Sequence, residues 1–147
     1  MRRIEFANEQ DRHAVDESRL CSAVTRVLEG ECVSEATISL AIVDDPTIHH
    51  LNRKYLDHDE PTDVLSFVLE QGPDALEGEI IVSADRAAAM ARGFGWSADD
   101  ELLLYVIHGA LHLVGYDDTN PSARAVMRGK ERAYLAEFGL EPRYEEA

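Results

Sequence analysis

The sequence is short of cysteine and of long apolar runs, and each shortage excludes a class of protein. Its two cysteines, Cys21 and Cys32, form no CxxC pair, which favours reduced thiols over a disulfide or a pair of metal ligands. No run reaches the roughly 18 apolar residues of a membrane helix, and the N-terminus has no apolar stretch of signal-peptide length. These shortages predict a cytoplasmic protein that does not act at a membrane.

Basic residues are also scarce, with 14 Lys and Arg against 29 Asp and Glu and a net charge of −15 at pH 7. Phosphate contacts supply most of the affinity of nucleic-acid-binding proteins, so this charge opposes such a function unless cations gather locally. Arg124, Arg128 and Arg132 recur at every fourth position and predict one basic stripe on the last helix. The alternative is a solvated helix face, paired with Glu131 and its neighbours.

The length of 147 residues predicts one domain, residues 1–147, and the hydrophobic patterns predict an α+β or α/β fold. Four segments rich in aliphatic and β-branched residues are expected to be strands: residues 3–8, 36–43, 64–69 and 78–83. Helical spacing and capping residues predict five helices: residues 15–29, one that Asp45 caps, residues 84–92, one that starts at Ser97 and one that starts at Asn120. The expected result is a mixed sheet of about four strands packed with about five helices, in the order βαβαββααα.

Two histidines four residues apart are the clearest functional signal. His108 and His112 lie in a strongly apolar segment in the C-terminal half, and on a helix they rise from one face about 5–6 Å apart at Cβ. Gly115 is expected to end this helix in a left-handed conformation, so that Asp118 can return a carboxylate to both imidazoles. Asp117 competes for that role, although the spacing favours Asp118.

Two imidazoles and one carboxylate leave a fourth position for water, which is typical of a catalytic zinc site. This donor set favours zinc over nickel, manganese or iron, with one ion per chain. A lone histidine pair on an apolar helix is more often a pair of core residues, so the interpretation depends on Gly115 and Asp118 as well. The extended metalloprotease motif shares the spacing, but Gly109 occupies the position of its general-base glutamate. A site without that base suits a substrate that is already anionic.

Two segments resemble the hallmark motifs of the YbeY-type endoribonucleases. The first is HGALHLVGYD, residues 108–117, and the second is LNRKYLDHDEPTDVLSF, residues 51–67. The resemblance extends from about Ile38 to Phe138. The chain departs from the family pattern at Asp118, where a third histidine is usual, and at Leu56, where an arginine is common. Aspartate is an ordinary zinc ligand, whereas the leucine removes a cation that could hold phosphate.

The resemblance implies a zinc-dependent enzyme that cuts single-stranded RNA during rRNA maturation, at the 3′ end of the small-subunit rRNA, and in ribosome quality control. It implies a mixed sheet with the metal helix beside it. His108, His112 and Asp118 would hold the ion and act through its bound water. The implied partners are rRNA, the small ribosomal subunit and a ribosomal protein or assembly GTPase, with no DNA.

Four cations are candidates for contacts to the RNA. Arg124 and Arg128 follow the metal motif closely in sequence. Arg53 and Lys54 lie near the position of the missing arginine and are candidates to replace it.

Two other functions match part of the pattern. A ribosome-assembly factor with a structural metal and little or no catalysis is favoured by Leu56 and by the net charge of −15. A metalloprotease is disfavoured by Gly109, because that motif needs a glutamate there.

Overall fold

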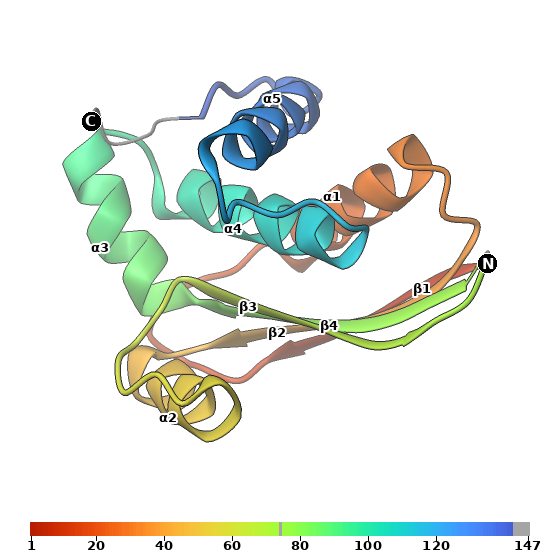
Figure 1. Cartoon of the computed structure of the whole chain (residues 1–147). Coiled ribbons are helices and arrows are strands. Elements are labelled where there is room, and N and C mark those ends of the chain that lie inside the picture. Colours follow the sequence, from red (N-terminus) through yellow and green to blue (C-terminus); the bar gives the residue numbers. More distant parts are fainter. Residues whose placement is uncertain (74, 143–147) are drawn as a thin grey trace.

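The structure, a computed structural model, describes residues 1–73 and 75–142, in which a four-stranded sheet separates two layers of helices (Figure 1). The strand order is β1-β2-β4-β3. β1 (Arg2–Asn8), β2 (Glu35–Val43) and β4 (Ala75–Ser83) run parallel to one another, whereas β3 (Val64–Gln71) pairs antiparallel with β4. The predicted mixed sheet and the predicted order of elements are confirmed.

Alternation along the strands decides which face carries the core. In β2, Ile38, Leu40 and Ile42 are almost fully buried, and the residues between them are only partly covered. β4 is buried on both faces over its last four residues, where it lies between β2 and β3. The larger core therefore lies on one face of the sheet, and a smaller cluster around Ile48 and Leu65 lies on the other.

The helices cover these two faces unequally. α1 (Glu17–Gly30) and α4 (Ala98–Leu113) pack on the face that carries the larger core, and α5 (Pro121–Ala136) packs on α4 (Figure 1). α3 (Ala84–Phe94) lies beside α4 at one end of the sheet, and α2 (Asp45–Leu56) lies on the opposite face. α4 is thus enclosed by the sheet, α1, α3 and α5.

The structure corrects three predicted boundaries, two at helix starts that capping residues fix and one at the start of a strand. The sequence predicts Asp45 as the cap of α2, but Asp44 accepts the Thr47 N–H at 2.9 Å and Asp45 is the first helical residue. α1 begins at Glu17 rather than at residue 15, because Asp16 caps it. β4 begins at Ala75 rather than at residue 78, because its first residues pair with the start of β2.

α4 approaches the sheet at Gly109. Eleven of the sixteen residues of α4 are buried. An added Cβ at Gly109 would lie 2.7 Å from Ile80 Cγ2 and 3.1 Å from Val64 Cγ2. The Ser66 hydroxyl, on β3, donates to the Gly109 carbonyl at 3.2 Å. α4 is apolar because it lies at the centre of the fold. Among the helices that the described residues form, none is both long enough and apolar enough to cross a membrane.

We expect Gly109→Ala to lower the free energy of unfolding by about 1–3 kcal/mol, because the new methyl group overpacks the contact with Ile80. The control is Gly129→Ala on α5, where an added Cβ meets no atom within 4 Å. There the higher helix propensity of alanine should raise stability by about 0.5–1 kcal/mol. Urea unfolding of both variants tests this prediction. An equal gain in the free energy of unfolding in both variants would contradict the close approach of α4 to the sheet.

Candidate metal centre

The end of α4 brings the predicted donor residues together. His108 and His112 are four residues apart and leave the helix on the same side. Gly115, with φ of +109°, then reverses the chain, since its N–H donates to the His112 carbonyl at 3.1 Å and the Tyr116 N–H donates to the Leu111 carbonyl at 3.0 Å. These two bonds are those of a Schellman motif, which ends a helix with a left-handed residue. The chain after it returns Asp118 to the two imidazoles.

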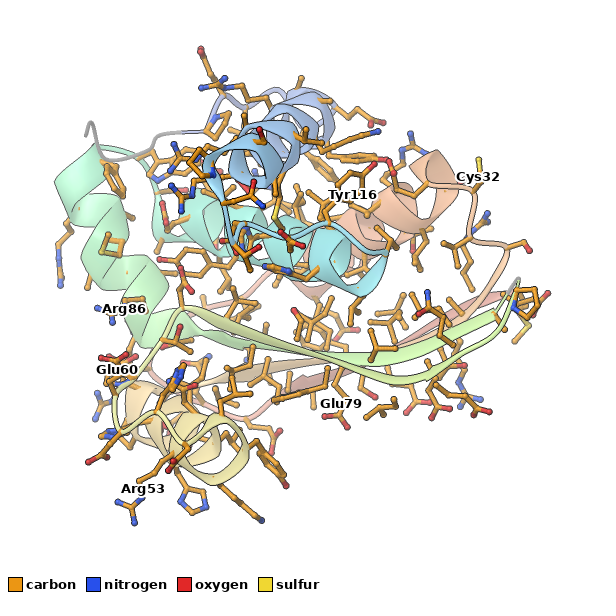
Figure 2. The ribbon with its side chains drawn as sticks, viewed as in Figure 1. Cys32, Arg53, Glu60, Glu79, Arg86 and Tyr116 are labelled. Carbon is orange, nitrogen blue, oxygen red and sulfur yellow. The ribbon has the colours of Figure 1, made fainter. Side chains whose placement is uncertain are left out.

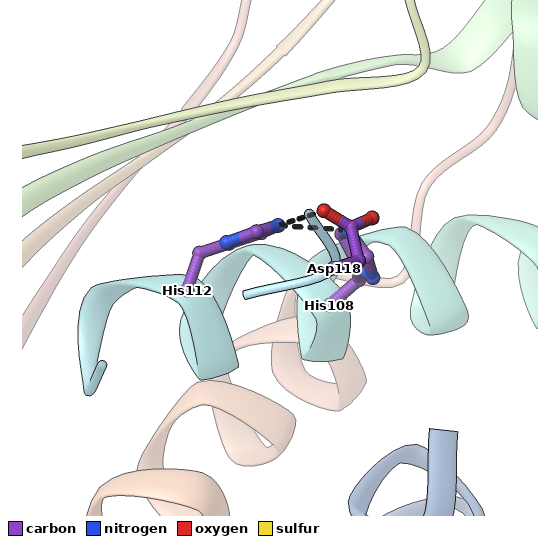
Figure 3. A group of neighbouring side chains, drawn as sticks. All are labelled: His108, His112 and Asp118. Atoms are coloured by element: carbon purple, nitrogen blue, oxygen red, sulfur yellow. Dashed lines mark hydrogen bonds and ion pairs between the residues drawn. The ribbon is translucent and has the colours of Figure 1, made fainter. Parts of the chain in front are cut away.

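The three donor groups surround one point (Figure 3). The Nε2 atoms of His108 and His112 are 3.1 Å apart, and the Asp118 carboxylate oxygens lie 3.7 Å and 3.8 Å from them. Donors on a tetrahedral zinc ion lie about 3.3 Å apart when each bond is about 2.0–2.1 Å long. The donors are half-buried, with 24%, 29% and 45% of their side chains exposed. Their types and spacing therefore suit one metal ion with an open position.

Asp117 has a different environment. Its carboxylate accepts the Thr119 hydroxyl at 3.0 Å and the Thr119 N–H at 3.3 Å, within its own turn. Asp118 is the member of the donor group, so the structure places the carboxylate where the sequence spacing favours it.

Glu131 on α5 holds His108 in position. Its Oε2 lies 2.8 Å from His108 Nδ1, and its side chain is only 4% exposed. A carboxylate at Nδ1 favours the proton on that nitrogen, which leaves the Nε2 lone pair for an ion. This carboxylate–histidine arrangement is common behind metal ligands, because it fixes the tautomer and the ring orientation.

The two imidazoles differ in their affinity for protons. Burial lowers the pKa of His108, but the hydrogen bond and charge of Glu131, together with the charge of Asp118, outweigh it and raise that pKa above its ordinary value. Burial and the neighbouring charge of His108 lower the pKa of His112. A metal ion must displace a proton where a donor is protonated, so metal affinity at this site should fall as the pH falls.

A groove with a volume of about 860 Å³ opens beside the donors. His108 and Asp118 lie in its lining, together with residues of α3, of α5 and of the loop before β3. Three cations line it: Arg86 from α3, and Arg124 and Arg128 from α5. Positive side chains therefore reach the groove from two walls, despite the net charge of −15.

The other predicted cations lie elsewhere. Arg53 and Lys54 are exposed on α2, across the sheet from α4, and Figure 2 shows Arg53 pointing away from the sheet. Arg53 lies 3.9 Å from Asp59, and the Lys54 ammonium lies over the Tyr55 ring. Neither side chain is among those that line the groove beside the donors.

Sequence reasoning missed two residues of this site. Glu131 entered the sequence analysis only in the alternative interpretation, as a partner of the arginine stripe on a solvated face, but it is buried and contacts His108. Its position was a usable signal, because it shares a helical face with the buried Met127, Tyr134 and Leu135. Arg86 carried no comparable signal, since only the packing of α3 against α4 brings it to the groove.

Position 109 has no part in the donor group. It faces the sheet, and even a Cβ there would meet Ile80. A glutamate at this position would need space that β3 and β4 occupy, so the structure leaves no room for the metalloprotease base.

Comparison with known proteins gives consistent matches. The sequence model of a family described as Endoribonuclease YbeY matches residues 5–139. The Endoribonuclease YbeY of Salinibacter ruber is 42% identical over 129 residues, covering 82% of each chain. That of Moorella thermoacetica is 40% identical over 149 residues, covering 90% of this chain and 95% of the relative. A solution structure of a Thermotoga maritima protein is 30% identical, with a TM-score of 0.60, and covers 93% of this chain and 88% of that one.

Proposed function

This chain belongs to the endoribonuclease YbeY family, and on that ground we propose that it is a hydrolase that cuts phosphodiester bonds within single-stranded RNA and uses one zinc ion. Residues 1–147 would form one catalytic domain. The observation that carries the proposal is the convergence of His108, His112 and Asp118 beside a groove that has cations on two walls.

The position of each residue in the site determines its proposed role. His108, His112 and Asp118 would hold the ion, and Glu131 would keep His108 in the tautomer that binds it. When bound, zinc supplies a Lewis acid for a phosphoryl oxygen and lowers the pKa of water.

The cations of the groove would receive the RNA backbone. Arg124 and Arg128 approach from α5 and Arg86 approaches from α3, so a strand in the groove would meet arginines on both sides, although five carboxylates line the groove as well. Arg86 is a better candidate than Arg53 or Lys54 to replace the missing arginine, because it lines the groove and they do not. Leu56, which stands at the missing position, is 45% exposed.

The cellular role proposed is rRNA maturation at the 3′ end of the small-subunit rRNA, with ribosome quality control, in the cytoplasm. The substrate would be rRNA of the small ribosomal subunit. A net charge of −15 repels RNA at long range, so a ribosomal protein or an assembly GTPase would help to deliver the protein to its site. The alternative, an assembly factor with a structural metal and little catalysis, is favoured by the same charge and by Leu56.

The test compares zinc-loaded protein on a single-stranded RNA oligonucleotide and on the same strand annealed to its complement. We expect cleavage of the single strand to be at least about tenfold faster, because a flexible single strand can enter the groove beside the half-buried donors, whereas a rigid duplex cannot. Stoichiometric zinc without cleavage of either substrate would favour the assembly factor. Equal rates on both substrates would contradict the preference for single strands.

A further inference from the structure

The groove continues past the metal donors along α4. Glu101, Tyr105 and His108 line it and follow one another at helical spacing, so they form one stripe on the groove side of the helix. Apolar and aromatic side chains line the same stretch: Met90, Phe94, Leu104 and Met127. Glu101 lies two helical turns, about 10 Å along the axis, from His108.

Glu101 is a carboxylate in an unusual environment. It is only 3% exposed, and its Oε1 accepts the Trp96 indole N–H at 2.8 Å. Burial raises the pKa of Glu101 above its ordinary value, although hydrogen bonds from Trp96 and Tyr105 act in the opposite direction. Both donors are neutral, and a carboxylate has about four lone-pair sites. A ligand that brings a further N–H into the groove would therefore find an acceptor whose burial makes that bond favourable.

From this arrangement we propose that the groove is a base-recognition subsite, in which a nucleobase lies against the partly exposed Met90 and Phe94 and donates from its exocyclic amino group to Glu101. The proposal rests on the proposed function, because it places the phosphate of the same nucleotide at the metal donors. The spacing from His108 to Glu101 is comparable to the distance from a backbone phosphate to the pairing edge of its own base. Unstacked bases of single-stranded RNA are recognised in this way, by stacking and by hydrogen bonds to their edges.

The chemistry of Glu101 predicts a definite preference. Adenine, cytosine and guanine carry an exocyclic amino group, whereas uracil offers only its ring N3–H, which lies between two carbonyl oxygens. A carbonyl oxygen that faces the Glu101 carboxylate would be repelled and would add no hydrogen bond to those from Trp96 and Tyr105. The subsite should therefore accept amino-bearing bases and disfavour uracil.

The experiment uses zinc-loaded protein and single-stranded RNAs that are oligouridine except for one adenosine. A matched set replaces that adenosine by nebularine, the purine nucleoside that lacks only the amino group. We expect the adenosine to fix the position of cleavage and to bind at least about tenfold more tightly than nebularine or uridine, by fluorescence anisotropy. Because the amino group is the only change between the two purines, this comparison needs no protein variant.

Protein variants assign the preference to a residue. Glu101→Gln retains the volume and offers an amide that can pair with a carbonyl, so the preference should fall to about twofold or less. Glu60→Gln, at an exposed residue of the same groove, should keep it. RNA cleavage without any difference between adenosine and nebularine would overturn the base subsite and leave the proposed function standing. Selective binding without cleavage would support the subsite and contradict the function.

Discussion

Replacing His112 by alanine should reduce RNA cleavage by at least about a hundredfold. Loss of a residue behind a metal ligand typically costs 10–100-fold in metal affinity or activity, and loss of the ligand itself should cost more. His112 contributes an Nε2 atom 3.1 Å from that of His108, so the variant would leave one imidazole and one carboxylate for the ion. Cleavage rates at saturating zinc measure the effect.

The matched control is His50→Ala, since His50 is exposed on α2, across the sheet from α4. It should cleave RNA at the parent rate. A His112→Ala variant that is folded, as judged by its circular dichroism and unfolding transition, and that still cleaves at the parent rate would exclude a catalytic role for this site.

Glu131→Gln should weaken zinc binding by about 10–100-fold while the fold persists. Glutamine has nearly the same volume but no charge, so it no longer favours the proton on His108 Nδ1. The same change removes the charge, and weakens the hydrogen bond, that raise the pKa of His108, so burial should then hold that pKa lower than in the parent. Competition with a chelator measures zinc affinity, and NMR titration follows the His108 pKa.

Glu137→Gln is the control for this prediction. Glu137 directly follows α5 and contacts Arg26 of α1 at 2.7 Å, and it is not a member of the donor group. Its loss should leave zinc affinity unchanged. Equal zinc affinity for Glu131→Gln and the parent would mean that the contact from Glu131 to His108 does not strengthen zinc binding.

Local signals in the sequence account for much of this structure. Runs of aliphatic and β-branched residues predicted the strands, and the spacing of His108, His112 and Gly115 predicted the donor helix and its end, because each pattern depends on residues that are close in sequence. The cap of α2 was placed one residue late, since Asp44 and Asp45 are both good capping residues.

The rest of the site depends on packing between distant segments. Glu131 is 23 residues from His108 and meets it only because α5 lies on α4. The groove exists because α3 and α5 flank α4, so no local pattern could identify Arg86 as part of its lining. A buried charge on an apolar helix face is the signal to seek in such sequences, and both Glu101 and Glu131 carry it.

The central claim is a metal site made by His108, His112 and Asp118, and elemental analysis of the purified protein tests it most directly. We predict about one zinc per chain in the parent, markedly less in Asp118→Ala, and a parent-like content in Asp117→Ala, whose carboxylate contacts Thr119 instead. A parent protein that contains no metal and cannot be loaded with zinc would contradict the account.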